Sequence, residues 1–514
     1  MPQYQLLWGD LHTHLVDFDR GDAILGDARE NIDFAAVLCY PFEWDTRRGL
    51  RVESVGNRPH FLEWWERLRE LARAHHEPGR FVTFLGYEWN GNRTRYGDHN
   101  VIYFHEDSPL DDAWSLPDLY ANLRSTRALA IPHHTGYRPH RRGKDWDVFD
   151  PQLSPVMEVV SIHGSSEGCD TPLGMTSNTS MGPRAAGGTF HDALARGLRV
   201  GVLGSNDYAG LPGRWGIGRA AVWAEACTRE AIWEALLARR TYAVTGDRIE
   251  LDFRVAGQPM GSELEAGGPV DAQVQVVGSA AIDRIDLLNA GRLVASHVPA
   301  DRPETPPAQT GERSRYKVRI EVGWGPCATY GFQPHDWRWK GRLEVEGGRL
   351  VGVERCFSLG GQRLASVDER HCAFELVTAG RAVRNPFGMT QAIVAELEGS
   401  PRSRLTLDIE GGRLELAVAD LLRGGRLVPL IEESVERVQA DFGIHEEEIG
   451  NPDIYYHNAR KVKIHRAVPQ AAYRVAHAFQ DVELAPGRHP LHVRVWQRNG
   501  QLAWSSPIWV QVRG

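Results

Sequence analysis

The sequence is poor in cysteine and has neither a long apolar run nor an excess of basic residues. Its six cysteines are scattered over 514 residues without a Cys-x-x-Cys pair, which disfavours a disulfide framework and indicates reduced, mostly buried thiols. No stretch approaches the roughly 18 apolar residues of a membrane-spanning helix, and residues 1–8 lack the basic and apolar regions of a signal peptide. We therefore expect a cytoplasmic protein that does not bind membranes.

The balance of charge is acidic, which narrows the choice of partner. The chain carries 59 Lys and Arg against 67 Asp and Glu, a formal net charge of -8. Binders of nucleic acids or anionic membranes present a basic face, so we predict a small-molecule substrate and no nucleic-acid partner. With 42% hydrophobic residues over 514 positions, the chain should form two to four globular domains. This composition is also compatible with a homo-oligomer.

Up to residue 247, short apolar runs alternate with segments of helical periodicity. Two helices are expected, over residues 61–72 and 230–239. Such alternation predicts an α/β fold, either a βα barrel or a layered sheet, with its site at the carboxyl ends of the strands. The candidate strands are residues 4–8, 34–40, 81–87, 100–104, 129–132, 157–162, 200–204 and 220–223.

After residue 247 the pattern changes to alternating strands separated by glycine turns. Residues 346–350 and 410–414 share the sequence Glu-Gly-Gly-Arg-Leu and are predicted to form matching hairpin tips. Residues 299–313, rich in proline, are expected to form an exposed connector. We predict a catalytic domain over residues 1–247 and an all-β region of one or two sandwiches over residues 248–514.

The most informative segment is Trp8-Gly9-Asp10-Leu11-His12-Thr13-His14. Histidines two positions apart on an extended backbone point to the same side, and imidazole is the commonest protein ligand for transition metals. A single His-x-His pair is a weak signal, but further potential ligands follow later predicted strands. These are Glu88, His99, His133, His134, His163 and Asp207. A carboxylate among imidazoles can bridge two cations and suits Zn, Mn or Fe rather than Ca.

Together these segments resemble the PHP (polymerase and histidinol phosphatase) metallohydrolases. They are more closely similar to a bacterial family of unknown function that joins a PHP-like barrel to a C-terminal β region. The resemblance implies a distorted (β/α)7-type barrel before the β-sandwich region, and phosphoesterase chemistry. The segments that carry it are residues 9–14, 86–89, 98–101, 132–134, 161–164, 205–207, 245–249 and 503–509.

Two departures from the family pattern concern the third metal of its trinuclear sites. The family usually carries an Asp-His pair after its second strand, where this chain has Cys39-Tyr40. The family also usually ends with Asp-x-His, and here Asp207 is followed by Tyr208-Ala209. Their joint absence implies a site for two ions. The resemblance assigns His12, His14, Glu88 and Asp207 to one ion, and Glu88, His99 and His133 to the other.

Two such ions, about 3.5 to 4 Å apart, can share a water whose pKa falls toward about 7 and so provide a hydroxide nucleophile. We predict a hydrolase of a small-molecule phosphoester, with Glu88, Asp207 and His163 as catalytic residues. Two alternatives stay open. The same ions could serve hydrolysis of an amide, lactone or other C–O or C–N bond, or the barrel could be a degenerate module that binds a ligand or partner without catalysis.

Four further residues are assigned to substrate binding: Tyr40, in the vacated third-metal position, His134, Glu167 and Arg214. Each assignment has a plainer alternative. His163 with Glu167 could belong to an ordinary satisfied strand end, and arginines such as Arg142 and Arg214 could lie on the surface. Cys39 is expected to be an inert thiol, and the tryptophans after residue 320 are expected to pack in a sandwich core.

Overall fold

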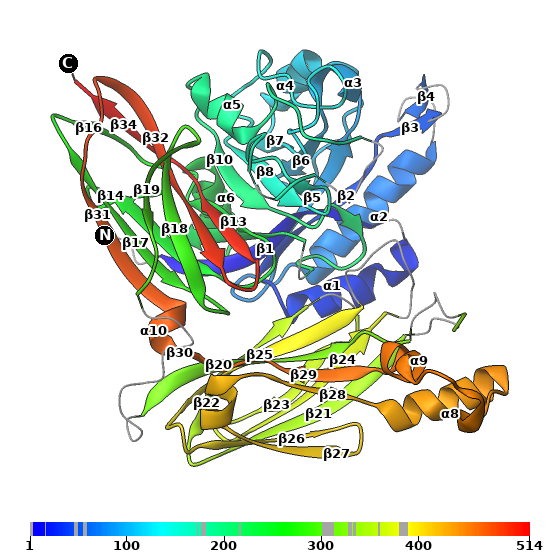
Figure 1. The fold of residues 1–514 in the computed structure, drawn as a ribbon. Coiled ribbons are helices and arrows are strands. Elements are labelled where there is room, and N and C mark those ends of the chain that lie inside the picture. The colour runs from blue at the N-terminus through cyan, green and yellow to red at the C-terminus, as the bar shows by residue number, and fades with distance from the viewer. Residues whose placement is uncertain are drawn as a thin grey trace. The chain divides into compact units, whose positions relative to one another are not determined.

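The computed structural model describes residues 4–15, 17–45, 50–54, 59–171, 173–175, 181–214, 217–300, 313–326, 331–332, 336–357, 360–379 and 389–513. It divides into two compact units (Figure 1). Unit 1 comprises residues 1–278, 282–298 and 475–514, and unit 2 comprises residues 279–281 and 299–474.

The centre of unit 1 is a mixed sheet that contains six of the eight predicted strands, together with β11 and β13, which the sequence does not predict. β1, β2 and β5 run parallel, β6 and β7 continue antiparallel beyond β5, and β12 and β13 extend the sheet antiparallel from β1. Every residue of β2, β5, β6 and β7 is buried, which explains why they read as continuous apolar runs. The bounds are β1 Gln5–His14, β2 Phe34–Cys39, β5 Val82–Trp89, β6 His99–Tyr103, β7 Ala128–Pro132, β11 Tyr208–Ala209, β12 Arg219–Ala224 and β13 Thr241–Val244.

A separate sheet of three strands follows β7 in the chain. It has the order β10-β8-β9, formed by β8 (Val156–Ser161), β9 (Gly164–Ser165) and β10 (Gly201–Gly204). Within the described residues, hydrogen bonds thus join the predicted strands into two sheets and not one closed ring. Between β7 and the segment before β8, one backbone bond runs from Ala130 N to Leu153 O at 2.7 Å. The α/β class is confirmed, and a closed barrel stays a prediction.

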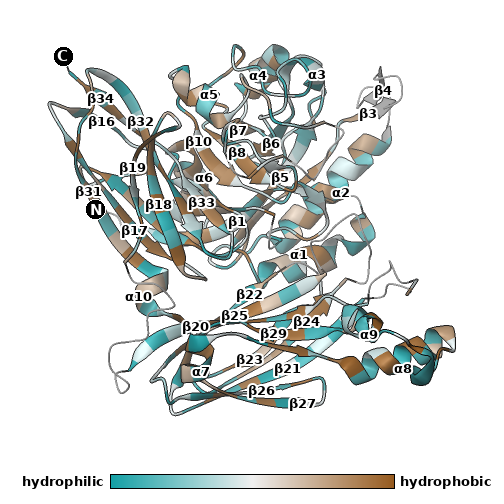
Figure 2. Cartoon of the chain, in the orientation of Figure 1, coloured by the Kyte–Doolittle hydropathy of each residue, from teal (hydrophilic) through white to brown (hydrophobic). Residues whose placement is uncertain are grey.

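Helices cover both faces of the mixed sheet. Trp65 and Leu68 of α2 (Pro59–His75) belong to the same buried cluster as Leu85. Trp233 of α6 (Arg229–Leu237) packs on Phe84, which points to the opposite face, at 6.1 Å between ring centroids. Both predicted helices are confirmed, and brown, hydrophobic strands lie between them in Figure 2. The other elements of this part are η1 Phe18–Arg20, α1 Gly21–Arg29, β3 Phe42–Asp45, β4 Leu50–Ser54, α3 Arg93–Tyr96, α4 Leu116–Leu123 and α5 Phe190–Ala195.

The C-terminal end of the chain completes the same sheet. β33 pairs antiparallel with β13, and β32, β34 and β16 extend the sheet further. A second sheet, in the order β15-β14-β17-β31, packs beside it. The bounds are β14 Glu250–Val255, β15 Gln258–Pro259, β16 Glu263–Ala266, β17 Val270–Val277, β18 Ile282–Asn289, β19 Arg292–His297, β31 Arg474–Val482, β32 Gly487–Gln497, β33 Leu502–Ser505 and β34 Ile508–Val512.

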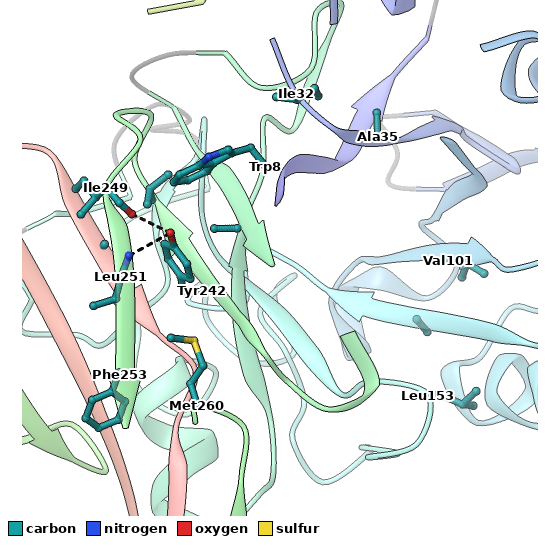
Figure 3. Close-up of a cluster of buried hydrophobic side chains, with 14 of the residues drawn as sticks. Trp8, Ile32, Ala35, Val101, Leu153, Tyr242, Ile249, Leu251, Phe253 and Met260 are labelled. Atoms are coloured by element: carbon teal, nitrogen blue, oxygen red, sulfur yellow. Dashed lines mark hydrogen bonds between the residues drawn. The ribbon is translucent and has the colours of Figure 1, made fainter. Parts of the chain in front are cut away.

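The core of unit 1 is continuous across residue 247. The Tyr242 ring meets Trp8 edge-on at 6.0 Å. Its hydroxyl donates to Ile249 O at 3.0 Å and accepts from Leu251 N at 3.3 Å (Figure 3). The predicted boundary therefore lies inside a shared core, and the division into domains at this residue stays a prediction.

Unit 2 consists of two sheets with a common core, which agrees with the predicted sandwich. One sheet has the order β22-β25-β20-β29-β28 with β30 beside β20, and the other has the order β23-β24-β21-β26-β27. Ile320 and Ile393 of the first sheet pack with Leu343 and Phe374 of the second. The bounds are β20 Ser314–Gly323, β21 Trp337–Glu346, β22 Arg349–Cys356, β23 Arg363–Val367, β24 His371–Thr378, β25 Thr390–Gly399, β26 Arg404–Ile409, β27 Gly412–Ala417, β28 Arg426–Pro429, β29 Lys461–Ile464 and β30 Val468–Pro469.

The two Glu-Gly-Gly-Arg-Leu segments have different roles. Gly411, with φ 75°, turns the hairpin of β26 and β27 as predicted. Gly347, with φ 70°, leads from β21 to β22, which belong to different sheets, so the predicted hairpin at residues 346–350 is wrong. A left-handed glycine fixes the local turn but not the strand pairing.

Several short helices in unit 2 have no counterpart in the sequence prediction. They are α7 Val418–Arg423, α8 Ile431–Phe442, η4 Glu446–Glu448, α9 Asp453–Asn458 and α10 Gln470–Tyr473. Most of the predicted connector, residues 301–312, lies outside the described residues. In the described part of the chain, no helix has the length and apolar character needed to cross a membrane.

Candidate metal centre

Four side chains that the sequence assigns to one ion converge in unit 1. His12 and His14 come from β1, Glu88 from β5 and Asp207 from the segment after β10, and each offers a ligand atom within 4.8 Å of the others. Glu88 Oε2 lies 3.3 Å from His12 Nε2 and 2.8 Å from His14 Nε2. Asp207 Oδ1 lies 3.3 Å from His12 Nε2, and its side chain is only 8% exposed. The group is therefore compact and largely shielded from solvent.

Irregular backbone positions these ligands. The pairing of β1 with β2 shifts register between Asp10 and Thr13, around His12. Buried Asp10 stabilises this bend because its carboxylate accepts from His12 N at 2.9 Å and from Gly213 N at 2.8 Å. Asp207 and His134 have φ values of 52° and 32°. Residues without the freedom of glycine adopt such angles mainly where the surrounding structure enforces them, as at functional sites.

A second group contains Asp98, His133 and His134. Asp98 Oδ2 lies 3.2 Å from His134 Nε2 and accepts from Arg142 Nε at 2.6 Å. His133 Nε2 lies 3.5 Å from Glu88 Oε1, the oxygen of Glu88 that the first group does not use. The two oxygens of one carboxylate thus face the two groups.

His99, assigned from the sequence to the second ion, is not part of either group. It stands opposite Trp89 in the pairing of β6 with β5, and strand alternation therefore places it on the face away from Glu88. Its ring packs edge-on against Trp89 at 5.8 Å and Tyr120 at 6.3 Å. No group of potential ligands in the described chain includes His99. Asp98, one residue earlier, belongs to the second group instead.

His163 joins the cluster through a third group, with His134 and Asp207. Its Nε2 lies 3.2 Å from Asp207 Oδ2, and its Nδ1 lies 2.8 Å from the hydroxyl of buried Tyr137. Burial lowers the pKa of both His163 and His134 to about 4. Both imidazoles are therefore neutral at pH 7, the form that coordinates metals.

Glu158 is a site residue that the sequence reasoning missed. It lies in the middle of β8, and its Oε2 accepts a hydrogen bond from His12 Nδ1 at 2.8 Å. Burial opposes its ionisation, yet the charge and hydrogen bond of His12 lower its pKa to about 2. A carboxylate on Nδ1 orients the ring so that Nε2 faces the ligand group. In the sequence, the signal for Glu158 is a single carboxylate within a strand of mostly apolar residues.

Replacing Glu158 with glutamine should weaken metal binding about 10–100-fold, because the loss of the negative charge makes His12 a poorer donor. Competition with a coloured chelator would measure the affinity of the full-length protein. Glu63→Gln on the exposed face of α2 is the matched control and should bind as the native chain does. Equal affinities for both variants would show that Glu158 does not support the site.

Charge in the cluster is dominated by carboxylates. Burial opposes the ionisation of Glu88, but His133, His12 and His14 hold its pKa well below the usual range. Burial likewise opposes protonation of His12, yet Asp207 and Glu158 raise the pKa of this imidazole well above 6.5. Without a cation, a proton on His12 therefore compensates the surrounding negative charge.

Cys39 and Tyr40 stand where the family pattern has the Asp-His pair of its third metal. The Tyr40 ring stacks on His14 at 4.7 Å with an interplanar angle of 8°, and its hydroxyl lies 3.4 Å from His14 Nε2. Burial raises the pKa of the Cys39 thiol to about 12, so this cysteine is not a thiolate at neutral pH. Contact of Tyr40 with a substrate stays a prediction.

The remaining predicted site residues lie in different surroundings. Glu167 accepts from Arg494 at 2.7 Å and lies 3.6 Å from His191 Nε2, so its carboxylate is engaged with other parts of unit 1. Arg214 is 4% exposed, with its guanidinium 4.9 Å from the Tyr208 ring centre. Neither belongs to a group of potential metal ligands in the described residues.

The family match to known proteins lies within unit 1. A family model described as a protein of unknown function (DUF3604) matches residues 26–134 and 208–275. An uncharacterized protein of Chlamydia pneumoniae is 27% identical over 320 residues, which are 57% of this chain and 49% of that protein. One from Chlamydia trachomatis is 25% identical over 312 residues, or 55% of this chain and 47% of that protein. The chain spans about half the length of the curated relatives it matches.

One solved structure is also similar. It is a two-domain protein from Bacteroides vulgatus that contains a predicted PHP-like metal-dependent phosphoesterase. The similarity covers 56% of this chain and 80% of that chain, with 15% identity and a TM-score of 0.33. The functional conclusion below therefore depends on the geometry of the site.

Proposed function

We propose that the protein is a metal-dependent hydrolase that uses two divalent transition-metal ions, Zn, Mn or Fe. The observation that carries this proposal is the convergence of His12, His14, Glu88 and Asp207 within 4.8 Å. A structural polar cluster satisfies its buried atoms internally. Here both ring nitrogens of His133 and Nδ1 of His14 are buried without a hydrogen-bond partner. Imidazoles and carboxylates with unused donor atoms fit the ligand preferences of these metals.

The residues divide between two ions. The four side chains of the first group would hold one ion, and His133 would hold the other together with Asp98 and His134. Glu88 would serve both, because Oε2 faces His12 and His14 while Oε1 faces His133. This replaces His99 by Asp98 in the set that the sequence predicted.

Divalent cations in such a centre polarise a phosphoryl or carbonyl oxygen and lower the pKa of water. Neutral His163 lies at the edge of the first group, where its Nε2 can hold or release a proton beside Asp207. The Tyr137 hydroxyl on Nδ1 fixes the orientation of this ring. Arg142, joined to Asp98, adds positive charge next to the cluster. This charge favours an anionic substrate, and we propose a phosphoester of a small molecule.

A screen of phosphomonoesters, phosphodiesters and simple esters with added Mn or Zn tests the activity. Phosphoester cleavage by the native chain, abolished in His12→Ala without loss of folding, would support the proposal. Cleavage of carboxylic esters alone would leave a metal-dependent hydrolase of another bond. A native chain that binds no divalent ion and cleaves none of these substrates would overturn the proposal. The cytoplasmic location also stays a prediction.

Metal binding at pH 7 should release about one proton, because His12 is protonated in the metal-free site and must lose that proton to coordinate. The apparent affinity should accordingly fall as the pH is lowered. Calorimetric titration with Zn in two buffers of different ionisation enthalpy measures the number of protons released. A heat that is independent of the buffer would contradict the protonated state of His12.

A further inference from the structure

Unit 2 contains a cavity far in sequence from the candidate metal centre. Its volume is about 410 Å³, and it is lined by Glu410, residues 429–433 and Arg460. This size is within the range of about 300–1,000 Å³ for small-molecule sites. The lining comes from the β26–β27 turn, the end of β28, the start of α8 and the residue before β29.

Arg460 is the buried polar group of this cavity. The residue is 3% exposed, and its Nε and Nη2 donate to the two oxygens of Glu433 at 2.8 and 2.6 Å. Its guanidinium lies 3.0 Å from the centre of the Trp337 ring. Nη1 is buried and has no hydrogen-bond partner. A buried donor of a charged group left without an acceptor is costly, so Nη1 is a position for an acceptor from outside the chain.

The start of α8 offers further donors beside this guanidinium. The helix has 12 residues, and its N-cap, Leu430, provides no side-chain hydrogen bond. The preceding Pro429 belongs to the same lining. The first N–H groups of a helix have no partner within the helix and carry partial positive charge. The cavity thus combines a helix N-terminus with Arg460 Nη1, which together suit a carboxylate.

The lining also contains three glutamates, Glu410, Glu432 and Glu433. Glu433 is engaged by Arg460 and by Arg437, but the described structure shows no ion pair of Glu410 or Glu432 with a cation. Glu410 has φ 49° at the β26–β27 turn. A simple anion would share the cavity with the carboxylates of Glu410 and Glu432, and a simple cation would leave Arg460 Nη1 unpaired. A sugar would find the Trp337 face already covered by Arg460.

We propose that this cavity binds a small zwitterion of the α-amino acid type. Its carboxylate pairs with Arg460 Nη1 and the start of α8, and its ammonium group pairs with Glu410 and Glu432. Arg460 is held ready for this role by Glu433 and Trp337, which fix two of its nitrogens and its ring face. The site is independent of the proposed hydrolase activity.

Thermal-shift and calorimetric titration of the full-length protein with each common L-amino acid, at up to about 10 mM, tests the proposal. At least one should bind, and its analogue without the amino group should bind about tenfold more weakly. Glu432→Gln and Glu410→Gln should each weaken binding about tenfold. Glu436→Gln, exposed one turn further along α8, is the matched control and should bind as the native chain does.

Arg460→Lys keeps the positive charge but removes Nη1, and it should lose binding if it folds. The two glutamate variants decide the question if it does not. Absence of binding by every amino acid would overturn the proposal. So would equal binding by the native chain and both glutamate variants, or equal binding of the analogue without the amino group, which would indicate a plain anion site.

Discussion

Glu88→Gln is expected to abolish hydrolysis and to remove at least one of the two ions. Glu88 faces both ligand groups, and its negative charge is shared by His12, His14 and His133. Removing one partner of a buried charge cluster costs roughly 3–5 kcal/mol, which corresponds to roughly 10²- to 5 × 10³-fold weaker metal binding. The loss should exceed that of any single histidine variant. Metal content and turnover on one substrate measure both effects.

Three further variants make this test specific. Glu225→Gln, on an exposed residue, should leave metal content and turnover unchanged. His99→Ala should retain both ions, because His99 lies outside the ligand groups, whereas His163→Ala should reduce turnover. If Glu88→Gln keeps two ions and a near-native rate, Glu88 does not bridge the groups. Loss of an ion in His99→Ala would restore the original assignment of the second ion.

Removing every residue after Asp247 is expected to unfold or aggregate the predicted catalytic half. β13 would lose its partner β33, and the side chains of Trp8 and Tyr242 would lose neighbours that begin at Ile249. Newly exposed apolar surface of this kind favours aggregation. Soluble yield, circular dichroism and gel filtration of the truncated chain would show the effect. A folded monomer that binds two ions would contradict it.

A point variant tests the same dependence in the intact chain. Trp504 of β33 is fully buried beside Val202 and Phe190 from the predicted catalytic half. Trp504→Ala should lower the free energy of unfolding by about 3–5 kcal/mol. Leu293→Ala, at a residue that is 62% exposed, should change it by less than about 0.5 kcal/mol. Chemical denaturation of both variants measures the difference, and an unchanged midpoint for Trp504→Ala would argue against the shared core.

The sequence predicts the strands of the α/β part well, because buried strands read as apolar runs and the runs end at chemically distinctive residues. His12, His14 and Glu88 are correctly brought together for this reason. His99 is not brought to these residues, because the face of the sheet that a side chain occupies depends on the register of its strand. A shift of one residue in this register exchanges His99 for Asp98. Apolar runs also do not encode whether strands close into a ring.

Residues that act through a neighbour were harder to predict. Glu158 and Tyr137 are defined by the imidazole nitrogen that each contacts, and no sequence spacing records that contact. The same limit applies to Arg460, which is far in sequence from Glu410 but lines the same cavity. The pairing of β13 with β33 also joins segments more than two hundred residues apart, which local periodicity does not encode.

Elemental analysis of the full-length protein, purified without chelator and then equilibrated with Zn or Mn, tests the proposed metal centre most directly. Two tightly bound ions per chain are predicted, with one lost or weakened in Glu88→Gln and none bound tightly after substitution of both His12 and His133. A native chain that binds no divalent ion would contradict the proposed function. Three tightly bound ions would contradict the two-ion site.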